Sequence, residues 1–322
     1  MKTWIKYLTL PILLLCLWGY LHWYINPVQR FDITHTPLVK PDITKKGNVA
    51  DEVALEEVAP EEVAAEIKPF NVLILGIDAR KQEVSRTDVI MLVNVNLKNK
   101  AVHVISIPRD TRVELPGIGF TKINHAHLLG EITGGNEGGT IASLQAVSEL
   151  LQCEIEYYVK LDFVAFSNFI DTIGGIEIEL DKPVWLSSAR KTLPVGKQHI
   201  DGDTALKLVR ERYSLPDGDF GRQKLQFLVL ETVAHELLKP KSLLKLPALV
   251  NEATKNGVDT NFNTSDIISL AWMFKKLPSG SINHLQLPGQ GGYAADPLVQ
   301  SVLYYWFPDL EQMQEISEQF RN

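Results

Sequence analysis

Three short apolar runs in the first third of the chain set the narrowest limit on its fold. They are NVLILG at 71–76, VIMLVNVNL at 89–97 and AVHVISI at 101–107, with the tight connection LKNK between the last two. Their β-branched residues favour strands, and they lack the apolar–polar alternation of a strand with one face in water. A sheet buried on both faces needs helices over each face. The runs therefore predict a layered α/β domain.

The segments that follow alternate between helical and extended patterns. They predict strands at 156–161 and 175–180, and helices at 139–151, 163–173, 221–238, 240–253, 265–277 and after Pro297. The run ALKLVRER predicts a further helix, capped by Asp201-Gly202-Asp203. We infer a three-layer α-β-α domain with a central mixed sheet over residues 70–322, without a second domain boundary.

The charge balance excludes one class of partner. The chain has 32 Lys and Arg against 39 Asp and Glu, a net charge of −7, and residues 51–66 alone hold seven acids and no base. Because no broad basic surface is left, we expect no nucleic acid partner, and any anion site must be a local group of arginines. The two cysteines, Cys16 and Cys153, exclude a disulfide framework and a cysteine-based zinc site in the domain.

The N-terminus predicts a membrane anchor. A tail at 1–6 with two lysines precedes an uncharged run of 19 residues at 7–25, close to the roughly 20 residues that a spanning helix needs. Trp and Tyr near both ends resemble interfacial belts, and no small-residue cleavage site follows. We expect a transmembrane signal anchor rather than a cleaved signal peptide. The chain would then be single-pass in the cell membrane, with a cytosolic N-terminus and an extracytoplasmic domain.

Residues 26–69 predict a linker between this anchor and the domain. They contain five prolines and the acidic run, a composition typical of a solvated tether. A charged partner-binding segment is the alternative.

Aspartate and arginine recur where the predicted strands end or begin. Asp78 follows the first strand, Asp88 opens the second, and Arg80 and Arg86 lie between them. Ligands of open α/β sheets bind at strand ends, carboxylates hold hard divalent cations, and guanidinium groups match phosphate. Either aspartate alone could serve as a turn or cap residue. Together they predict a site for a charged phosphate ester.

Two more segments add arginines to this site. Arg109 follows Pro108 in IPRDT, where the third strand ends; a surface ion pair with Asp110 is the alternative. Arg210 and Arg212 stand two apart, a spacing that aligns them only if the helix unwinds near Glu211; otherwise they are solvated helix charges. Farther along, Arg222 and Gln226 are four residues apart at the start of a predicted helix, so their side chains can share one face. The N-terminus of a helix also attracts phosphate.

Three other motifs carry no assigned chemistry. GGNEGGT at 134–140 lacks the GKS/T ending of a Walker A loop and predicts a turn into the next helix. The histidines of HAH at 125–127 are predicted to be core or capping residues. PGQGGY at 288–293 is a glycine loop without an interpretable role.

The motifs in their order resemble one family. GIDAR, SRTDVIML, SIPRDT, KINHA, the GG of DTIGGIEIEL, GDTALKLVRER and GDFGRQ appear collinearly between about 70 and 228. This pattern is similar to that of the LytR-CpsA-Psr family, whose members also have a short cytosolic N-terminus and a signal anchor.

The resemblance implies a magnesium-dependent phosphotransferase of the cell envelope. Such enzymes move a glycopolymer from an undecaprenyl-pyrophosphate carrier to peptidoglycan and bury the polyprenyl tail in an apolar pocket. By this resemblance Asp78 and Asp88 sit at Mg²⁺ and the pyrophosphate, and one of them is a candidate to accept the hydroxyl proton. The resemblance places the remaining polar contacts to the diphosphate at Arg86, Arg109, Arg210, Arg212, Arg222 and Gln226.

Two positions depart from the family pattern. Leu225 stands where another arginine is common, and Leu208 where an aromatic residue is frequent. Two alternatives to a transferase use the same residues or the same anchor. One is a non-enzymatic, envelope-related regulator (a transcriptional attenuator), and the other is a polyprenyl-pyrophosphate binding protein or pyrophosphatase. The sequence does not name the polymer.

Overall fold

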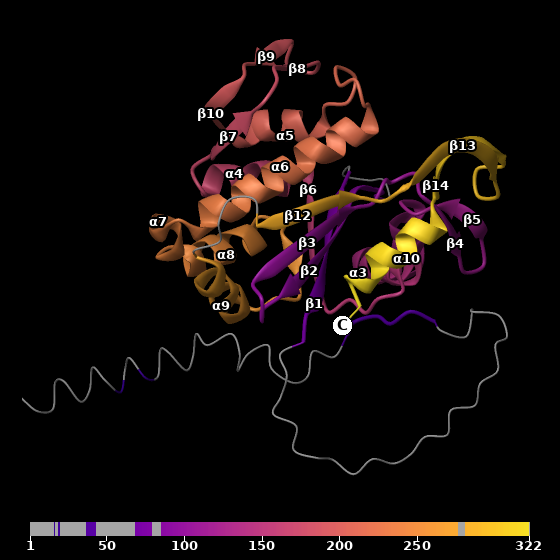
Figure 1. The fold of residues 1–322 in the computed structure, drawn as a ribbon, viewed down its shortest axis with the longest axis horizontal. Helices are drawn as coiled ribbons and strands as arrows, with labels where there is room; N and C mark the ends of the chain where they lie inside the picture. The colour runs from indigo at the N-terminus through magenta and orange to yellow at the C-terminus, as the bar shows by residue number, and fades with distance from the viewer. Residues whose placement is uncertain are drawn as a thin grey trace, which may run out of the picture.

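A central mixed sheet organises the domain in the computed structural model, which describes Cys16, Gly19 and residues 37–42, 68–78, 85–275 and 281–321. Within these residues the sheet has six strands in the order β11-β6-β1-β2-β3-β12 (Figure 1). The strands are β1 (Phe70–Ile77), β2 (Thr87–Asn96), β3 (Ala101–Ser106), β6 (Tyr157–Asp162), β11 (Asp259–Thr260) and β12 (Ile282–Gln286). β1 runs antiparallel to β2 and parallel to β6, and β3 runs antiparallel to β2 and parallel to β12. The predicted mixed sheet is confirmed.

The apolar runs face helices on both sides of this sheet. Leu73 and Leu92 pack into a core shared with α3 (His125–Leu151), and the neighbouring Val72 and Val93 pack into a second core on the opposite face. Because successive strand residues point to opposite faces, continuous apolar runs are what a doubly covered sheet requires.

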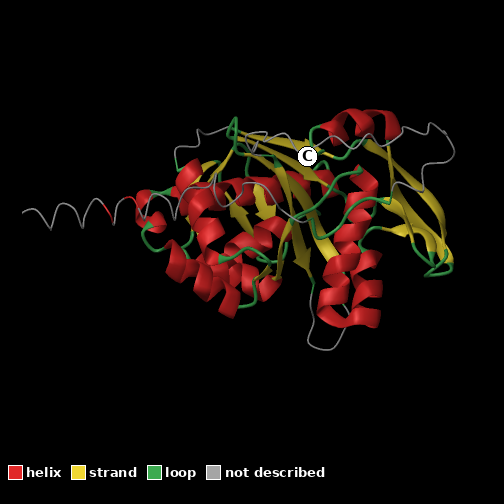
Figure 2. Ribbon diagram, turned by 90° about the horizontal axis from the view of Figure 1, so that it is seen from below, coloured by secondary structure: helices red, strands yellow, loops and turns green. Residues whose placement is uncertain are grey.

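The helices form the two outer layers (Figures 1 and 2). α3 and α10 (Leu310–Glu318) lie on one side of the sheet. The other side carries α4 (Phe163–Thr172), α5 (Gly202–Arg210), α6 (Asp219–Leu238), α7 (Pro240–Leu243), α8 (Leu246–Lys255) and α9 (Thr264–Phe274).

Small antiparallel pairs extend from the three layers. They are β4 (Arg112–Leu115) with β5 (Gly119–Lys122), β7 (Ile176–Leu180) with β10 (Gly196–Ile200), β8 (Val184–Leu186) with β9 (Lys191–Leu193), and β13 (Gly289–Asp296) with β14 (Ser301–Pro308). The β13–β14 hairpin projects on the α3 side of the sheet (Figure 1).

Several element predictions need correction. The helix predicted at 139–151 already begins at His125 and bends where Gly134 and Gly135 leave helical geometry, which agrees with the predicted turn in GGNEGGT. The helix predicted at 240–253 is two helices, α7 and α8. No helix directly follows Pro297: β14 comes first, because its aromatic and β-branched residues pair with β13, and α10 begins only at Leu310.

The N-terminal predictions fall largely outside the described residues. None of the helices in the described part of the chain combines the length and the hydropathy of a membrane span, and the predicted anchor at 7–25 is described only at Cys16 and Gly19. Residues 37–42, inside the predicted linker, lie against the domain: Val39 pairs with Ile155 and is buried in the α3-side core.

Candidate functional site

A β-bulge positions the two predicted carboxylates. Gly76 of β1 pairs with Val89 of β2, but the next residue, Ile77, pairs with Thr87, so Asp88 is the extra residue of the bulge. Bulges bend a strand and redirect a side chain. Asp78 follows directly after β1. Both carboxylates line one polar cavity of about 700 Å³.

The polar cavity also holds basic groups from neighbouring segments. Arg86 lines it, and Arg109 enters from the loop after β3 and forms an ion pair with Asp88. Burial acts to lower the pKa of Arg109, but the charges of Asp88, Asp110 and Asp219 outweigh this effect and raise it. Arg109 is therefore a permanent cation whose negative partner lies in the same cavity.

Four cavity residues were missed by the sequence analysis: Asp110, Lys122, Asn124 and His125. Lys122 donates to Asp110 at 2.6 Å, so Lys122 rather than Arg109 is the close partner of this carboxylate. The amide oxygen of Asn124 is buried without a hydrogen-bond partner among the described residues, which suits a ligand-facing group. The KINHA motif contains three of these four residues, so this motif was the signal in the sequence that could have identified them.

The second pair of arginines lies where α5 stops. α5 ends at Arg210, and Glu211 is extended (φ −68°, ψ 131°), as joint action of the pair requires. The Arg210 guanidinium lies 4.3 Å from the centre of the Phe163 ring. Arg212 lies 4.7 Å from the Tyr213 ring and donates to its hydroxyl at 2.8 Å.

Arg222 and Gln226 occupy the first turns of α6. The Arg222 side chain is nearly buried and pairs with Asp219 at 2.5 Å. Burial lowers the pKa of Arg222, Asp219 opposes this effect, and the positive charges of Arg109 and Arg212 lower it further. The positive charges of Arg109 and Arg212 therefore reach Arg222, although neither Arg212 nor Arg222 is among the residues that line the polar cavity.

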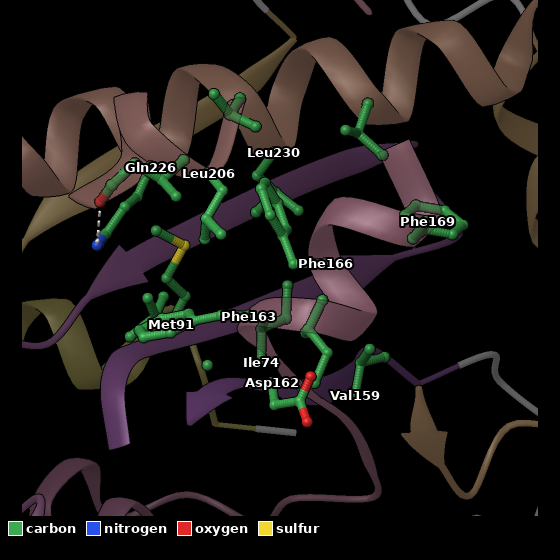
Figure 3. Close-up of a pocket in the computed structure, with 16 residues that line it drawn as sticks. Ile74, Met91, Val159, Asp162, Phe163, Phe166, Phe169, Leu206, Gln226 and Leu230 are labelled. Atoms are coloured by element: carbon green, nitrogen blue, oxygen red, sulfur yellow. Dashed lines mark hydrogen bonds between the residues drawn. The ribbon is translucent and has the colours of Figure 1, made fainter. Parts of the chain in front are cut away.

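An apolar cavity of about 260 Å³ lies on the face of the sheet that carries α4 and α6 (Figure 3). Gln226 lines it and donates to the carbonyl of Val209 at 3.1 Å, one residue before Arg210. Its aromatic lining comes mainly from α4, with Phe163, Phe166 and Phe169. A second apolar cavity of about 400 Å³ shares Val159 and Phe169 with the first and continues between α6, α8 and α9.

Residues that line the polar cavity and the first apolar cavity lie close together at one end of the sheet. Gly76 and Val89 line the apolar cavity, whereas Asp78, directly after β1, and Asp88, next to Val89 in β2, line the polar one. Asp162 at the end of β6 pairs with Ile77, so Phe163 comes level with Asp78. Of the predicted arginines, only Arg80 lies outside the described residues.

Comparison with known proteins identifies the family. The model of the LytR_cpsA_psr family matches residues 40–322. The chain belongs to the LytR-CpsA-Psr family. The resemblance drawn from the motifs is confirmed, and the family match reaches the C-terminus of the chain.

Relatives in the family share the length and the fold of this protein. The polyisoprenyl-teichoic acid–peptidoglycan teichoic acid transferase TagU of Bacillus cereus is 30% identical over 299 residues, 92% of this chain and 89% of that protein. The crystal structure of Bacillus subtilis TagV is 30% identical with a TM-score of 0.67, covering 79% of this chain and 96% of that one. The structure of TagT bound to LI-WTA is 27% identical with a TM-score of 0.63, covering 78% and 89%.

Proposed function

We propose that this protein transfers a glycopolymer from a polyisoprenyl-pyrophosphate carrier, such as undecaprenyl pyrophosphate, to peptidoglycan. The observation that carries the proposal is the junction of a charged cavity with an apolar one at the same sheet end. A ligand that fills both must have a compact anionic head and a long apolar tail. A lipid pyrophosphate has this form, and the transferase names of the relatives point the same way.

The junction itself supports this assignment. Arg210 stacks on Phe163, a wall residue of the apolar cavity, so its charge lies where a lipid head would join the tail. A side chain at Gly76 would put its Cβ 2.9 Å from two carbon atoms of Val89. Glycine therefore leaves room for the proposed passage of the lipid between the polar and the apolar cavity. The second apolar cavity offers space for the continuation of the tail.

The carboxylate pair suits magnesium. The described residues contain no group of three or more His, Cys, Asp or Glu side chains that could hold a metal ion by themselves. Magnesium commonly takes one or two carboxylates and completes its shell with phosphate oxygens and water. Asp78 and Asp88 fit that pattern in a cavity open to phosphate. When bound there, Mg²⁺ would neutralise charge on the pyrophosphate.

The remaining chemistry falls to the chain's own residues. Arg109, Arg210 and Arg212 bind the diphosphate and stabilise the charge that builds on the leaving phosphate. Either Asp78 or Asp88 accepts the proton of the acceptor hydroxyl. The oxygen of that hydroxyl bonds to the glycan-bearing phosphorus, the P–O–P bond breaks, and the electron pair leaves with the polyprenyl phosphate.

The apolar N-terminal run supports a location for this reaction at the membrane. We propose that residues 7–25 anchor the protein in the cytoplasmic membrane with the domain outside. A tether beside a lipid-linked donor raises the effective concentration of that donor. Fusion of a periplasmic-type reporter enzyme after residue 322 tests this topology, and a reporter active only in the cytosol contradicts it.

One assay tests the transfer. The full chain in detergent receives a lipid-linked glycan, Mg²⁺ and peptidoglycan oligomers, and we expect a covalent glycan–peptidoglycan product. Asp88→Ala and Arg210→Ala should each lower the rate at least about a hundredfold, as loss of a charge-stabilising group does. Lys191→Ala removes an exposed charge on β9 and serves as the matched control.

The other outcomes identify the alternatives. Release of free glycan phosphate without product would assign a pyrophosphatase. Donor that stays bound but unchanged would assign a lipid-pyrophosphate carrier or a non-enzymatic regulator.

A further inference from the structure

The β13–β14 hairpin presents aromatic residues to solvent. Tyr293 pairs with Tyr304 across the hairpin, and their rings meet edge to face at 5.8 Å. Tyr293 is 74% exposed and Tyr304 is 42% exposed, and the adjoining Val302 on the same face is also exposed. We call this face, made by Tyr293, Val302, Tyr304 and Trp306, the aromatic platform. An exposed apolar surface of this kind commonly marks a binding site.

The glycines of PGQGGY explain how the platform is built. A Cβ atom at Gly291 would lie 2.5 Å from the Tyr304 hydroxyl and 2.9 Å from its ring, so the ring lies against the bare backbone of β13. Gly289 makes room for Trp306 in the same way, with its indole nitrogen 2.8 Å from the position of such an atom. The motif therefore supports flat-lying aromatic rings rather than a phosphate loop.

The hairpin that carries the platform also borders the polar cavity. Val299 in its turn and Leu303 of β14 line that cavity together with Asp110, and Leu303 points to the face opposite Val302 and Tyr304 because successive strand residues alternate. The amide of Trp306 donates to the carbonyl of Asp110 at 2.9 Å. The Trp306 ring lies edge-on to Phe220, two residues before Arg222, with ring centres 4.6 Å apart.

Electrostatics give a second sign of this proximity. Burial raises the pKa of Tyr304, and the negative charges of Asp110 and Asp219 raise it further. The Tyr304 hydroxyl therefore lies within range of carboxylates that belong to two different sides of the site.

We propose that the aromatic platform binds the acceptor glycan, a chain of pyranose sugars, and that Tyr293 and Tyr304 are its specificity-determining contacts. This inference rests on the proposed function, because it assigns the second substrate of that reaction. The C–H faces of a pyranose ring pack on the negative face of an aromatic ring, and the Tyr hydroxyl can bond to sugar hydroxyls.

The geometry of the displacement reaction favours the acceptor glycan, rather than the donor glycan, as the ligand of the aromatic platform. In phosphoryl transfer the attacking and leaving oxygens lie roughly in line through phosphorus. The leaving group is the polyprenyl phosphate, whose tail lies on the α4–α6 face of the sheet. The hydroxyl must then approach from the opposite direction, which is the α3 side, where the hairpin projects (Figure 1). The donor's own glycan stays bonded to this phosphorus. It points away from the line that joins the attacking and leaving oxygens.

The test separates the two substrates. Tyr293→Ala with Tyr304→Ala should raise the KM for peptidoglycan oligomers about tenfold or more, with little change in the KM for the lipid-linked donor. Tyr304→Phe keeps the ring and should stay within about threefold of the unsubstituted protein. Trp272→Ala, which removes a half-exposed aromatic residue from α9, is the matched control. Thermal unfolding of each variant monitors its fold.

Binding of the oligomers without donor provides an independent measurement, followed by intrinsic fluorescence. If the unsubstituted protein makes no product, the proposed function fails. Binding of the oligomers without donor still tests the platform in that case. Weaker binding in the double variant supports the platform. Unchanged acceptor KM and binding overturn it. A rise in donor KM alone also overturns it, because the platform would then hold the donor glycan.

Discussion

Glu211 holds the loop that carries Arg212, and its replacement tests how the site is built. The carboxylate is buried at the end of α5. It accepts the backbone amides of Arg212, Tyr213 and Ser214 at 3.0, 2.9 and 3.1 Å, and the amide and hydroxyl of Ser187 at 2.6 and 3.0 Å. One side chain thus ties the unwound segment to the β8–β9 pair.

Glu211→Gln should destabilise the domain by about 3 kcal/mol. The new amide nitrogen cannot accept from the Ser187 amide, and the other bonds lose the help of charge; a hydrogen bond to a charged group contributes about 1.5–3 kcal/mol and a buried unsatisfied donor costs about 1–3 kcal/mol. For a domain of this size the loss corresponds to a fall in Tm of roughly 6–12 °C. Because Arg212 loses its support, kcat/KM for the donor should also fall about tenfold or more.

The effect should depend on pH in a defined direction. Burial alone would raise the pKa of Glu211, but the bonds from Ser187, Ser214 and Tyr213 outweigh it, and the pKa is lowered from its ordinary value of 4.5. The stabilisation is therefore complete above the unfolded pKa and is lost as pH falls through the folded pKa. The difference between the two proteins should shrink below about pH 4.5.

Urea unfolding and donor kinetics measure both effects. Glu179→Gln is the control, because this carboxylate is 62% exposed and pairs with Lys197 only at 3.6 Å, so its loss should cost less than about 0.5 kcal/mol. A Glu211→Gln protein as stable as the control would refute the reasoning on the loop. A destabilised but fully active protein would refute the link between the loop and the site.

Three further predictions concern single residues. Gly76→Ala should raise the KM for the lipid donor several-fold, since the new Cβ would meet Val89 at 2.9 Å; unchanged donor kinetics would contradict the proposed passage. Burial, reinforced by the charge of Lys224, lowers the pKa of His284 from 6.5 to about 4, so the unfolded state binds more protons and the free energy of unfolding should decrease as pH falls from 6.5 to 4. A His284→Gln variant should lack this slope, and an unaltered slope would exclude His284 as its source. Burial raises the pKa of Cys153 to about 12, so iodoacetamide at pH 8 should label it only after denaturation; rapid labelling of the folded protein would show that the thiol is exposed.

Much of the fold could be predicted because its signals are local. The runs that became β1, β2 and β3 carry their double-sided burial in their own residues. Asp201 caps α5 by accepting from the amide of Thr204, as expected from residues a few positions apart. The spacing of Arg210 and Arg212 left two alternatives open, and the structure shows the one in which the helix ends before Glu211. Each of these features depends on a short stretch of chain.

The errors lie where pairing decides the structure. The segment after Pro297 became a strand because a glycine-rich partner, β13, lies beside it. The HAH histidines are buried, as predicted, yet His125 also lines the polar cavity. Lys122 and Asn124 were visible in a motif, but nothing local shows that they face Asp78.

The strand runs, the helix caps and the placement of charged residues along the chain could be read from the amino-acid order, since these depend on side-chain chemistry within a few positions. Which of these residues share a cavity depends on how the layers pack. Val299 and Leu303 reach the cavity of Asp78 from more than 200 positions away, and Gly76 and Asp78 face different cavities from one strand end. Such juxtapositions arise from the packing of whole layers, which leaves no periodic trace in the chain.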